Sequence, residues 1–398
     1  MRRILMGIVL SLLFAVEAAA VPASWDGILE KARGQTVYWN AWAGDENTNA
    51  FIEWSAGRVK EKYGVDLQHV KIRLTSESVS RVVAEKAAGR NEGGSIDLIW
   101  INGENFMAMK EQGLLFGPFT ERLPNFKLVD TERKPTTVID FTVPVEGMES
   151  PWRMAQVVYA YDSARIKDPP RGIPAMLEWA RKNPGRITHP QIRNFLGSTF
   201  LKQALTELVD DPKVLQKPAT DDDFQKETKL LWTWYEELKP LMWRKGKQFP
   251  ESGPAMRQLL ADGEIDIMIS FSPNEASISI AKGILPPSIR TFVLEKGTIG
   301  NTSFVAIPYN ANAKEGAMVV ADFLLSPEAQ ARMQNPEMLG NPSVLDLGKL
   351  SPEDHKLFDG LPKGVATLSQ AELGVPLPEP HPSWMNRIVQ EWERRYSK

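Results

Sequence analysis

The sequence predicts an α/β protein with two domains, on the basis of three observations. Between Trp25 and Phe119, short apolar runs alternate with stretches of helical periodicity, an order that is typical of a parallel sheet covered by helices. A second unit, in which a helical pattern leads into an apolar strand, lies between residues 254 and 271. The chain has 398 residues, and at roughly 150 residues per domain this length suggests two or three domains.

Three pairs of strand and helix make up the first predicted domain. Phe51, Trp54 and Val59 recur at helical spacing after cap residues. The run IDLIWI at residues 96–101 is continuously apolar, which suits a strand covered on both faces. We therefore expect strands at 37–41, 65–74 and 96–101, each followed by a helix, at 45–62, from 76 onward and at 105–112.

Residues 119–151 interrupt this rhythm, because proline recurs at 118, 124, 135, 144 and 151. We interpret this stretch as a connection that leads out of the first domain. In the second domain, Pro254 stands near a helix start and Gly263 stands where a C-cap belongs. The remaining expected elements are strands at 156–161, 265–271 and 303–307, helices within 175–182, 200–235 and 314–325, another from 327, and a last helix from 382 after loops.

The first twenty residues have the pattern of a secretory signal peptide. Arg2 and Arg3 precede an apolar run from Ile4 to Val16, and Ala18 and Ala20 supply a small-residue cleavage site. The apolar run is shorter than the roughly 20 residues that cross a bilayer. No cysteine follows it, so lipid attachment is not expected. The pattern predicts a mature protein that is free in the bacterial periplasm.

Composition excludes several classes of function. The chain has no cysteine, which rules out disulfide scaffolds, thiol nucleophiles and Cys-ligated zinc. Its net charge of -3 argues against nucleic-acid binding, because phosphate neutralisation needs a basic excess. The four histidines are too scattered to form a local metal-ligand pair, and we expect no metal and no cofactor. The familiar hydrolase, zinc-peptidase, P-loop and dinucleotide motifs are absent.

Aromatic and amide residues gather where the predicted strands end. In open parallel sheets, ligands bind beyond the carboxyl ends of the strands. Here these ends carry Asn40 and Trp42 after the first strand, and Trp100, Asn102 and Glu104 after the third. Two further candidate stretches are SFSPNE at residues 270–275 and GTIGNTS at residues 297–303. Trp39, within the first strand, is expected in the core.

Two arginines leave an alternative open. Arg153 and Arg186 could each meet an anionic group of a ligand, although surface ion pairs are the commoner role of arginine.

Several stretches resemble a known family. The segment containing GNTSFVAIPYNANAKEGAMVVADFLLSPEAQARM resembles bacterial extracellular solute-binding proteins of family 1, in which a hinge strand leads to AIP, a polar turn and a helix ending in FLLSPEAQ. The unit LLADGEIDIMISFSPNEA is similar to the second-domain segment of that family. VYWNAWAGDENTNAFIEW and SIDLIWINGENF resemble its YnjB-type branch, with thiamine-, polyamine- and iron-binding relatives further off.

The resemblance implies the type II periplasmic-binding-protein fold, with two α/β lobes, two crossover strands and a ligand cleft between the lobes. It implies lobe 1 at 21–150 and 290–345, lobe 2 at 151–289, and a C-terminal segment, 346–398, that packs on the lobes. Iron is not expected, because the adjacent tyrosines of the iron-binding relatives are missing and only Tyr159 and Tyr161 come close. By this likeness the cleft residues are Asn40, Trp42, Trp100, Asn102, Glu104, Gln156, Phe271, Asn274 and Thr302.

These expectations lead to a functional hypothesis. The protein would be a monomer that captures a small organic solute and delivers it to an inner-membrane ABC permease. Trp42 and Trp100 beside Asp45 and Glu104 favour a cationic or zwitterionic solute, although indoles also stack on sugar rings. The alternatives are a periplasmic enzyme that pairs Glu104 with Glu275 as acid and base, and a ligand sensor for a membrane receptor.

Overall fold

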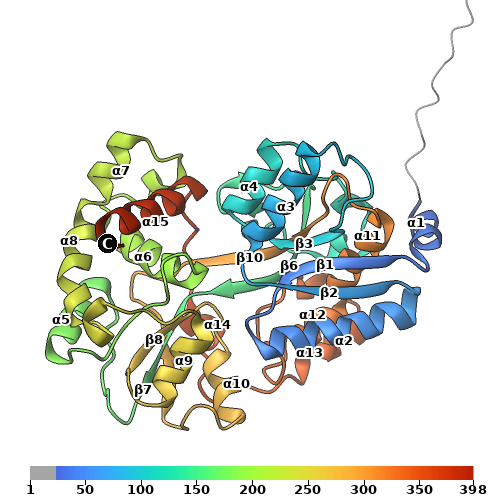
Figure 1. Cartoon of the computed structure of the whole chain (residues 1–398). Coiled ribbons are helices and arrows are strands. Elements are labelled where there is room, and N and C mark those ends of the chain that lie inside the picture. The colour runs from blue at the N-terminus through green and yellow to red at the C-terminus, as the bar shows by residue number, and fades with distance from the viewer. Residues whose placement is uncertain (1–23, 398) are drawn as a thin grey trace, which may run out of the picture.

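A computed structural model describes residues 24–397 of the chain, so the predicted signal peptide lies outside the described residues. Two α/β lobes lie side by side and are joined by the long strands β6 (Glu149–Gln156) and β10 (Gly300–Ala306) (Figure 1). We call the part around the five-stranded sheet lobe 1 and the part around the three-stranded sheet lobe 2. The predicted two-lobed α/β fold with crossover strands is confirmed.

The sheet of lobe 1 combines parallel and antiparallel strands in the order β2-β1-β3-β10-β6. β1 (Thr36–Trp42) pairs in parallel with β2 (Asp66–Ile72) and with β3 (Leu98–Ile101), as the alternation of strands and helices predicted. β10 runs antiparallel to β3 and to β6. The carboxyl ends of the three parallel strands therefore meet at one edge of the sheet.

Helices cover both faces of this sheet. One face packs on a core that includes Phe51, Trp39 and Trp152, and the other packs on a smaller core around Phe106 and Ile99. Trp39 is fully buried, as predicted, and meets the ring of Trp152 edge-on at 5.7 Å. The helices of lobe 1 are α1 (Trp25–Ala32), α2 (Glu46–Tyr63), α3 (Thr75–Ala87), α4 (Glu104–Glu111), α11 (Lys314–Leu324), α12 (Pro327–Gln334) and α13 (Pro352–Asp359).

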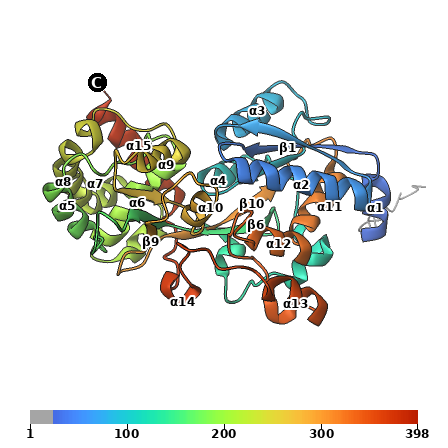
Figure 2. The ribbon, with the colours of Figure 1, turned by 90° about the horizontal axis from the view of Figure 1, so that it is seen from below.

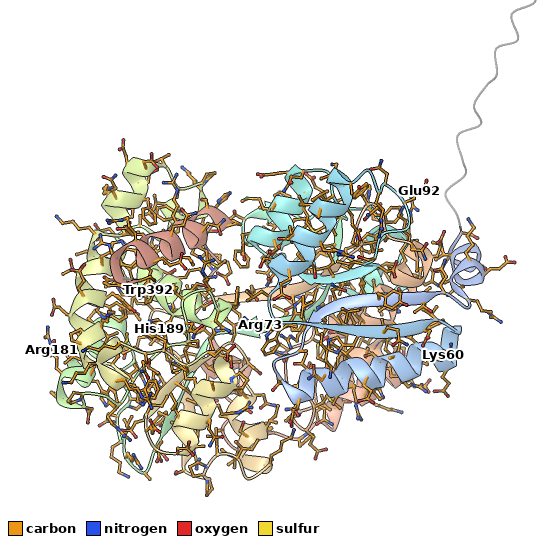
Figure 3. The ribbon with its side chains drawn as sticks, viewed as in Figure 1. Lys60, Arg73, Glu92, Arg181, His189 and Trp392 are labelled. Carbon is orange, nitrogen blue, oxygen red and sulfur yellow. The ribbon has the colours of Figure 1, made fainter. Side chains whose placement is uncertain are left out.

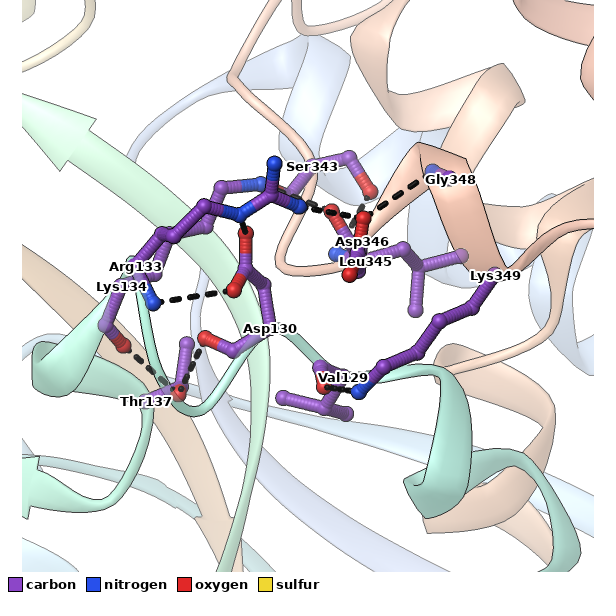
Figure 4. A network of polar contacts seen from close by, with 10 residues as sticks. All are labelled: Val129, Asp130, Arg133, Lys134, Thr137, Ser343, Leu345, Asp346, Gly348 and Lys349. Carbon is purple, nitrogen blue, oxygen red and sulfur yellow. Dashed lines mark hydrogen bonds and ion pairs between the residues drawn. The ribbon is translucent and has the colours of Figure 1, made fainter.

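The proline-rich stretch that was predicted as a connection packs against lobe 1. Arg133 pairs with Asp130 at 3.1 Å and also with Asp346, and the Lys134 ammonium donates to the carbonyls of Ser343 and Leu345 (Figure 4). These bonds tie two distant parts of the chain together. The stretch contains β4 (Ile139–Asp140), β5 (Val143–Pro144) and the 3-10 helices η1 (Thr120–Arg122), η2 (Pro124–Leu128) and η3 (Pro135–Thr137), and its partner segment contains η7 (Leu347–Lys349).

Lobe 2 surrounds a smaller antiparallel sheet, in which β7 (Val158–Asp162) lies between β8 (Ile267–Ser270) and β9 (Ile289–Phe292). The extended run predicted at 156–161 is divided here, because β6 ends at Gln156 and β7 begins at Val158 in the other sheet. The helices of lobe 2 are α5 (Ile173–Lys182), α6 (Phe195–Leu208), α7 (Asp221–Glu227), α8 (Lys229–Leu238), α9 (Gly253–Ala261), α10 (Glu275–Ala281) and α15 (Pro382–Tyr396), with η4 (Pro212–Gln216), η5 (Lys239–Leu241) and η6 (Trp243–Gly246).

The C-terminal segment contacts both lobes and the hinge strands. α13 packs on α12 of lobe 1, and the chain then passes α14 (Gln370–Leu373) below the hinge (Figure 2). The amide of Gly300 in β10 donates to the carbonyl of Leu377 at 3.0 Å. α15 begins at Pro382, as predicted, and packs on α6 of lobe 2. Short helices α13 and α14 occupy a part that was expected to be loops.

A buried ion pair connects this segment to the hinge. The Lys202 ammonium of α6 lies 2.6 Å from the Glu379 carboxylate, and the two side chains are 0% and 1% exposed. The second oxygen of Glu379 accepts from the Asn301 amide of β10 at 2.9 Å. Lys202 also lies 4.8 Å from the ring centroids of Phe141 and Phe195. One side chain thereby touches lobe 1, lobe 2 and the C-terminal segment.

Breaking this pair should destabilise the whole protein. Lys202→Met leaves the Glu379 carboxylate buried without its countercharge, and we expect a free energy of unfolding lower by about 3–5 kcal/mol in urea titrations. Lys226→Met is the matched control, because Lys226 is exposed and pairs with Glu227 on the surface. Equal stability of the two variants would contradict a stabilising role of the buried pair.

No helix within residues 24–397 is both long enough and apolar enough to span a membrane.

Candidate functional site

A cavity of about 600 Å³ lies between the lobes, and residues from both lobes and from the hinge strands line it. This volume is in the range of small-molecule sites. The parallel strands of lobe 1 end at this cavity, as expected for an α/β sheet. Its polar and aromatic lining includes Trp42, Asp45, Arg73, Trp100, Asn102 and Glu104 from lobe 1, Arg153, Asn301 and Ser303 from the hinge strands, and Phe195, Arg257, Phe271 and Glu275 from lobe 2.

The structure brings five of the nine predicted cleft residues to this cavity: Trp42, Trp100, Asn102, Glu104 and Phe271. The other four are buried side chains outside its lining. The Asn40 amide donates to Ser78 at 3.0 Å, and the Gln156 amide donates to Thr298 at 3.2 Å and to the Leu373 carbonyl at 3.0 Å. These amides satisfy polar groups within the fold.

Strand alternation explains the position of Thr302. Its hydroxyl donates to Thr136 at 3.0 Å on one face of β10, whereas its neighbours Asn301 and Ser303 line the cavity. Successive side chains of a strand point to opposite faces, so the predicted residue is on a strand that lines the cavity but has the opposite orientation. Asn274 is likewise buried, and its side-chain oxygen accepts a hydrogen bond from Thr367 of the C-terminal segment.

The two cavity tryptophans have different surroundings. Their rings meet edge-on at 6.3 Å, and Trp100 also packs edge-on against the buried Trp152 at 5.1 Å. Trp100 is 9% exposed, and the Arg153 guanidinium lies over its ring, 4.5 Å from the ring centroid. A cation of the protein therefore already covers Trp100. Trp42, which is less buried, offers the more accessible indole.

Arg153 and Arg186, left open by the sequence, have opposite environments. Arg186 binds Asp266 through Nε at 2.7 Å and through a second contact, so its charge is compensated in lobe 2. Arg153 has neither a hydrogen-bond acceptor nor a carboxylate within 4.0 Å among residues 24–397, and its Nε atom is buried. Burial lowers the pKa of Arg153 to about 10, while the charge of Asp45 opposes this effect. The guanidinium is still protonated at neutral pH.

Polar contacts cross the cavity between the lobes. Arg257 of α9 lies 3.1 Å from Glu275 in its own lobe and 3.9 Å from Asp45 of lobe 1. Lys282 of α10 contacts Asn47 of lobe 1. Asp45 also caps α2 by accepting from the Thr48 amide at 2.9 Å. The lobes are thus in direct contact at the cavity rim, as in a closed arrangement.

Glu104 occupies the first turn of α4 at the lobe 1 wall. Burial raises the pKa of its carboxyl to about 7, whereas the hydrogen bond to its own backbone and the charge of Lys202 act in the opposite direction. Burial also raises the pKa of the adjacent Asp140, which accepts from the Gly103 amide. The Glu104 carboxyl can therefore gain or lose a proton near neutral pH.

Comparisons with known proteins agree with this architecture. The sequence profile of the family described as bacterial extracellular solute-binding protein matches residues 54–346. The chain is 41% identical to Protein YnjB of Escherichia coli (strain K12) over 390 residues, which is 98% of each chain.

Two solved structures show the same fold at low sequence identity. The periplasmic binding protein AfuA from Actinobacillus pleuropneumoniae, with fructose-6-phosphate bound, aligns with a TM-score of 0.64 at 16% identity over 91% of this chain and 99% of that chain. The spermidine/putrescine ABC transporter substrate-binding protein PotD from Streptococcus pneumoniae aligns with a TM-score of 0.60 at 15% identity over 92% and 100%. The matched profile and the full-length relative show that the chain belongs to the bacterial extracellular solute-binding protein family.

Proposed function

We propose that this solute-binding protein captures a small zwitterionic organic solute in the periplasm and delivers it to an inner-membrane ABC permease. The observation that carries the proposal is the interlobe cavity, whose walls hold both carboxylates and arginines around an accessible indole. Membership of the bacterial extracellular solute-binding protein family supports the transport role. The solute class is inferred from the charges of the lining.

The lobe 1 wall is suited to a positively charged group. Trp42, Asp45 and Glu104 all belong to the lining of this wall. A cation over a desolvated tryptophan gains ~2 kcal/mol, and a charge-assisted hydrogen bond gains ~1.5–3 kcal/mol. A few such contacts reach the roughly -8 kcal/mol of a micromolar complex after the cost of ordering.

Contacts across the cavity supply a mechanism for closure. A solute that touches both walls binds the closed arrangement better than an open one, and this difference shifts the population. Arg257 and Asp45 already face each other from the two lobes at 3.9 Å. A bound zwitterion would add bridges of the same kind, and we expect the closed complex to be the form that the permease accepts.

The acid-base alternative has less support from the geometry. Both oxygens of Glu275 accept hydrogen bonds, one from Arg257 at 3.1 Å and the other from the Ser270 hydroxyl. These bonds engage both oxygens of Glu275 within lobe 2, which favours a structural role of this carboxylate over proton transfer. We therefore propose a carrier, and a monomeric one, that returns its ligand unchanged.

The decisive experiment combines binding, closure and turnover. Mass spectrometry of molecules that co-purify with the protein identifies candidates, and calorimetric titration measures their affinity. Small-angle scattering should show a more compact particle with the bound solute than without it. Recovery of intact solute at one per chain supports the carrier. Chemical conversion of the solute would instead favour an enzyme, and identical scattering in both states would contradict ligand-induced closure.

Trp42→Ala should weaken solute binding without unfolding the protein. The substitution removes the accessible indole of the cavity, and we expect at least a tenfold higher Kd, equivalent to about 1.4 kcal/mol, by calorimetry. Trp42→Phe should retain part of the affinity. Trp243→Ala, in lobe 2 and outside the cavity lining, is the control. An unchanged Kd in Trp42→Ala would place the solute elsewhere.

The pKa of Glu104 predicts a pH-dependent stability. Since the folded protein holds this proton up to about pH 7 and the unfolded chain loses it near 4.5, the free energy of unfolding should fall as pH rises between these values. The contribution of Glu104 is roughly 3 kcal/mol.

Urea unfolding at pH 5 and pH 8 measures this dependence. Asp140 and Glu149 have raised pKa values through burial and act in the same direction, so the comparison with Glu104→Gln isolates the share of Glu104. The control is Glu111→Gln, at the exposed end of the same helix. If Glu104→Gln and the unmodified protein lose equal stability between the two pH values, the assignment to Glu104 is wrong.

A further inference from the structure

An arginine that has no hydrogen-bond acceptor within residues 24–397 lies in the wall of the cavity. Arg153 projects from β6 over the rings of Trp100 and Trp152, at 4.5 and 5.1 Å from their centroids. The rings lie against the guanidinium, and its buried Nε–H has no acceptor among the described residues. A buried donor without a hydrogen bond carries a free-energy penalty. A ligand that supplies acceptors would remove that penalty.

The start of helix α3 provides a second set of free donors at the same cavity. Its N-cap residue is Leu74, which offers no side-chain acceptor, and Arg73, Thr75 and Ser76 line the cavity. The first amides of a helix lack intrahelical partners and carry a partial positive charge. Figure 3 shows Arg73 on the side of lobe 1 that faces lobe 2.

Helix α2 has the opposite arrangement. It also begins at the cavity, but the Asp45 carboxylate already binds the Thr48 amide at its N-terminus. Of these two helix starts, α3 is therefore the one open to an external acceptor.

Trp100 connects Arg153 with the start of α3. The Thr75 hydroxyl donates to the Trp100 carbonyl at 3.2 Å, while the ring of Trp100 carries the Arg153 guanidinium. On the hinge side, Ser303 pairs with Arg153 in the register of β10 and β6 and also lines the cavity. Trp100 thus contacts both the start of α3 and the arginine of the hinge strand.

We propose that Arg153 and the N-terminus of α3 form a subsite that binds an oxyanion group of the solute, a carboxylate or a phosphate. The proposal deepens the proposed function, on which it rests, by assigning the negative end of the zwitterion. The planar fork of arginine matches the two oxygens of such groups. The positive end then lies toward Trp42 and Asp45.

Simple anions test the subsite without knowledge of the natural solute. The thermal unfolding midpoint is measured in sodium acetate and in sodium phosphate, up to about 100 mM, with sodium chloride at equal ionic strength as reference. We expect a saturable rise of the midpoint with at least one anion. The anion with the higher affinity identifies the group, acetate for a carboxylate and phosphate for a phosphoryl group.

Arg153→Gln should weaken that anion by about 10- to 100-fold. Ser76→Pro, which removes one amide in the first turn of α3 where proline is tolerated, should weaken it independently. Arg186→Gln is the matched control, because Arg186 is paired with Asp266 and is not part of the cavity lining. Its anion response should equal that of the unmodified protein.

The outcomes separate this proposal from the proposed function. Absence of a saturable response in the unmodified protein, or an equal response in Arg153→Gln and Ser76→Pro, would overturn the subsite. The anion titration uses simple anions and does not need the natural solute, so a failure of the carrier hypothesis in the Trp42 experiments leaves the anion titration interpretable. If the anion response is normal and the natural solute is purely anionic, the subsite proposal stands and the proposal of a zwitterionic solute is refuted.

Discussion

The antiparallel pairing of β6 with β10 is the constraint on which the rest of the structure depends. These two strands complete the sheet of lobe 1 and lead directly into lobe 2, so they set where the two lobes are joined. Their register also decides what faces the cavity. Arg153 and Ser303 are opposite each other, and a slip of either strand by one residue would turn the side chain of that strand to the other face of the sheet.

Burial of charge around the hinge has two different consequences. Lys202 and Glu379 compensate each other at 2.6 Å, which favours a unique position of the C-terminal segment. Neither Glu104 nor Arg153 has an opposite charge this close among the described residues. Burial raises the pKa of Glu104 and lowers that of Arg153, which in each case favours the neutral form. The Lys202–Glu379 pair stabilises the fold. Glu104 and Arg153 remain able to form charge interactions with a ligand. Such uncompensated groups are typical of functional sites.

Sequence reasoning predicted most of the fold because its signals are local. The apolar run at 96–101, the cap at Asp45 and the Pro254 to Gly263 helix are each determined within about one helical turn of sequence, and the structure has elements at all three places. The orientation of a side chain within a strand was harder to predict. Asn40 and Thr302 are on the predicted strands but do not line the cavity, because Asn40 bonds Ser78 within lobe 1 and Thr302 is on the opposite face of β10 from its cavity-lining neighbours.

The proposed charge preference of the site could not be inferred from neighbouring residues either, because it rests on a contact between residues that are distant in the sequence. Trp100 beside Glu104 in the sequence favours a cation, but the fold places Arg153 of β6 on the ring of Trp100. The Trp100 ring then supports the Arg153 guanidinium, which would donate to a negatively charged group of a solute, instead of contacting a positively charged group itself. In the proposed function, the positive end of the solute therefore depends on Trp42 and Asp45, and the two charges of the solute would be bound at separate parts of the cavity wall. Because the hinge strand supplies one of these parts, binding of the negative end would act directly on the strands that set the angle between the lobes.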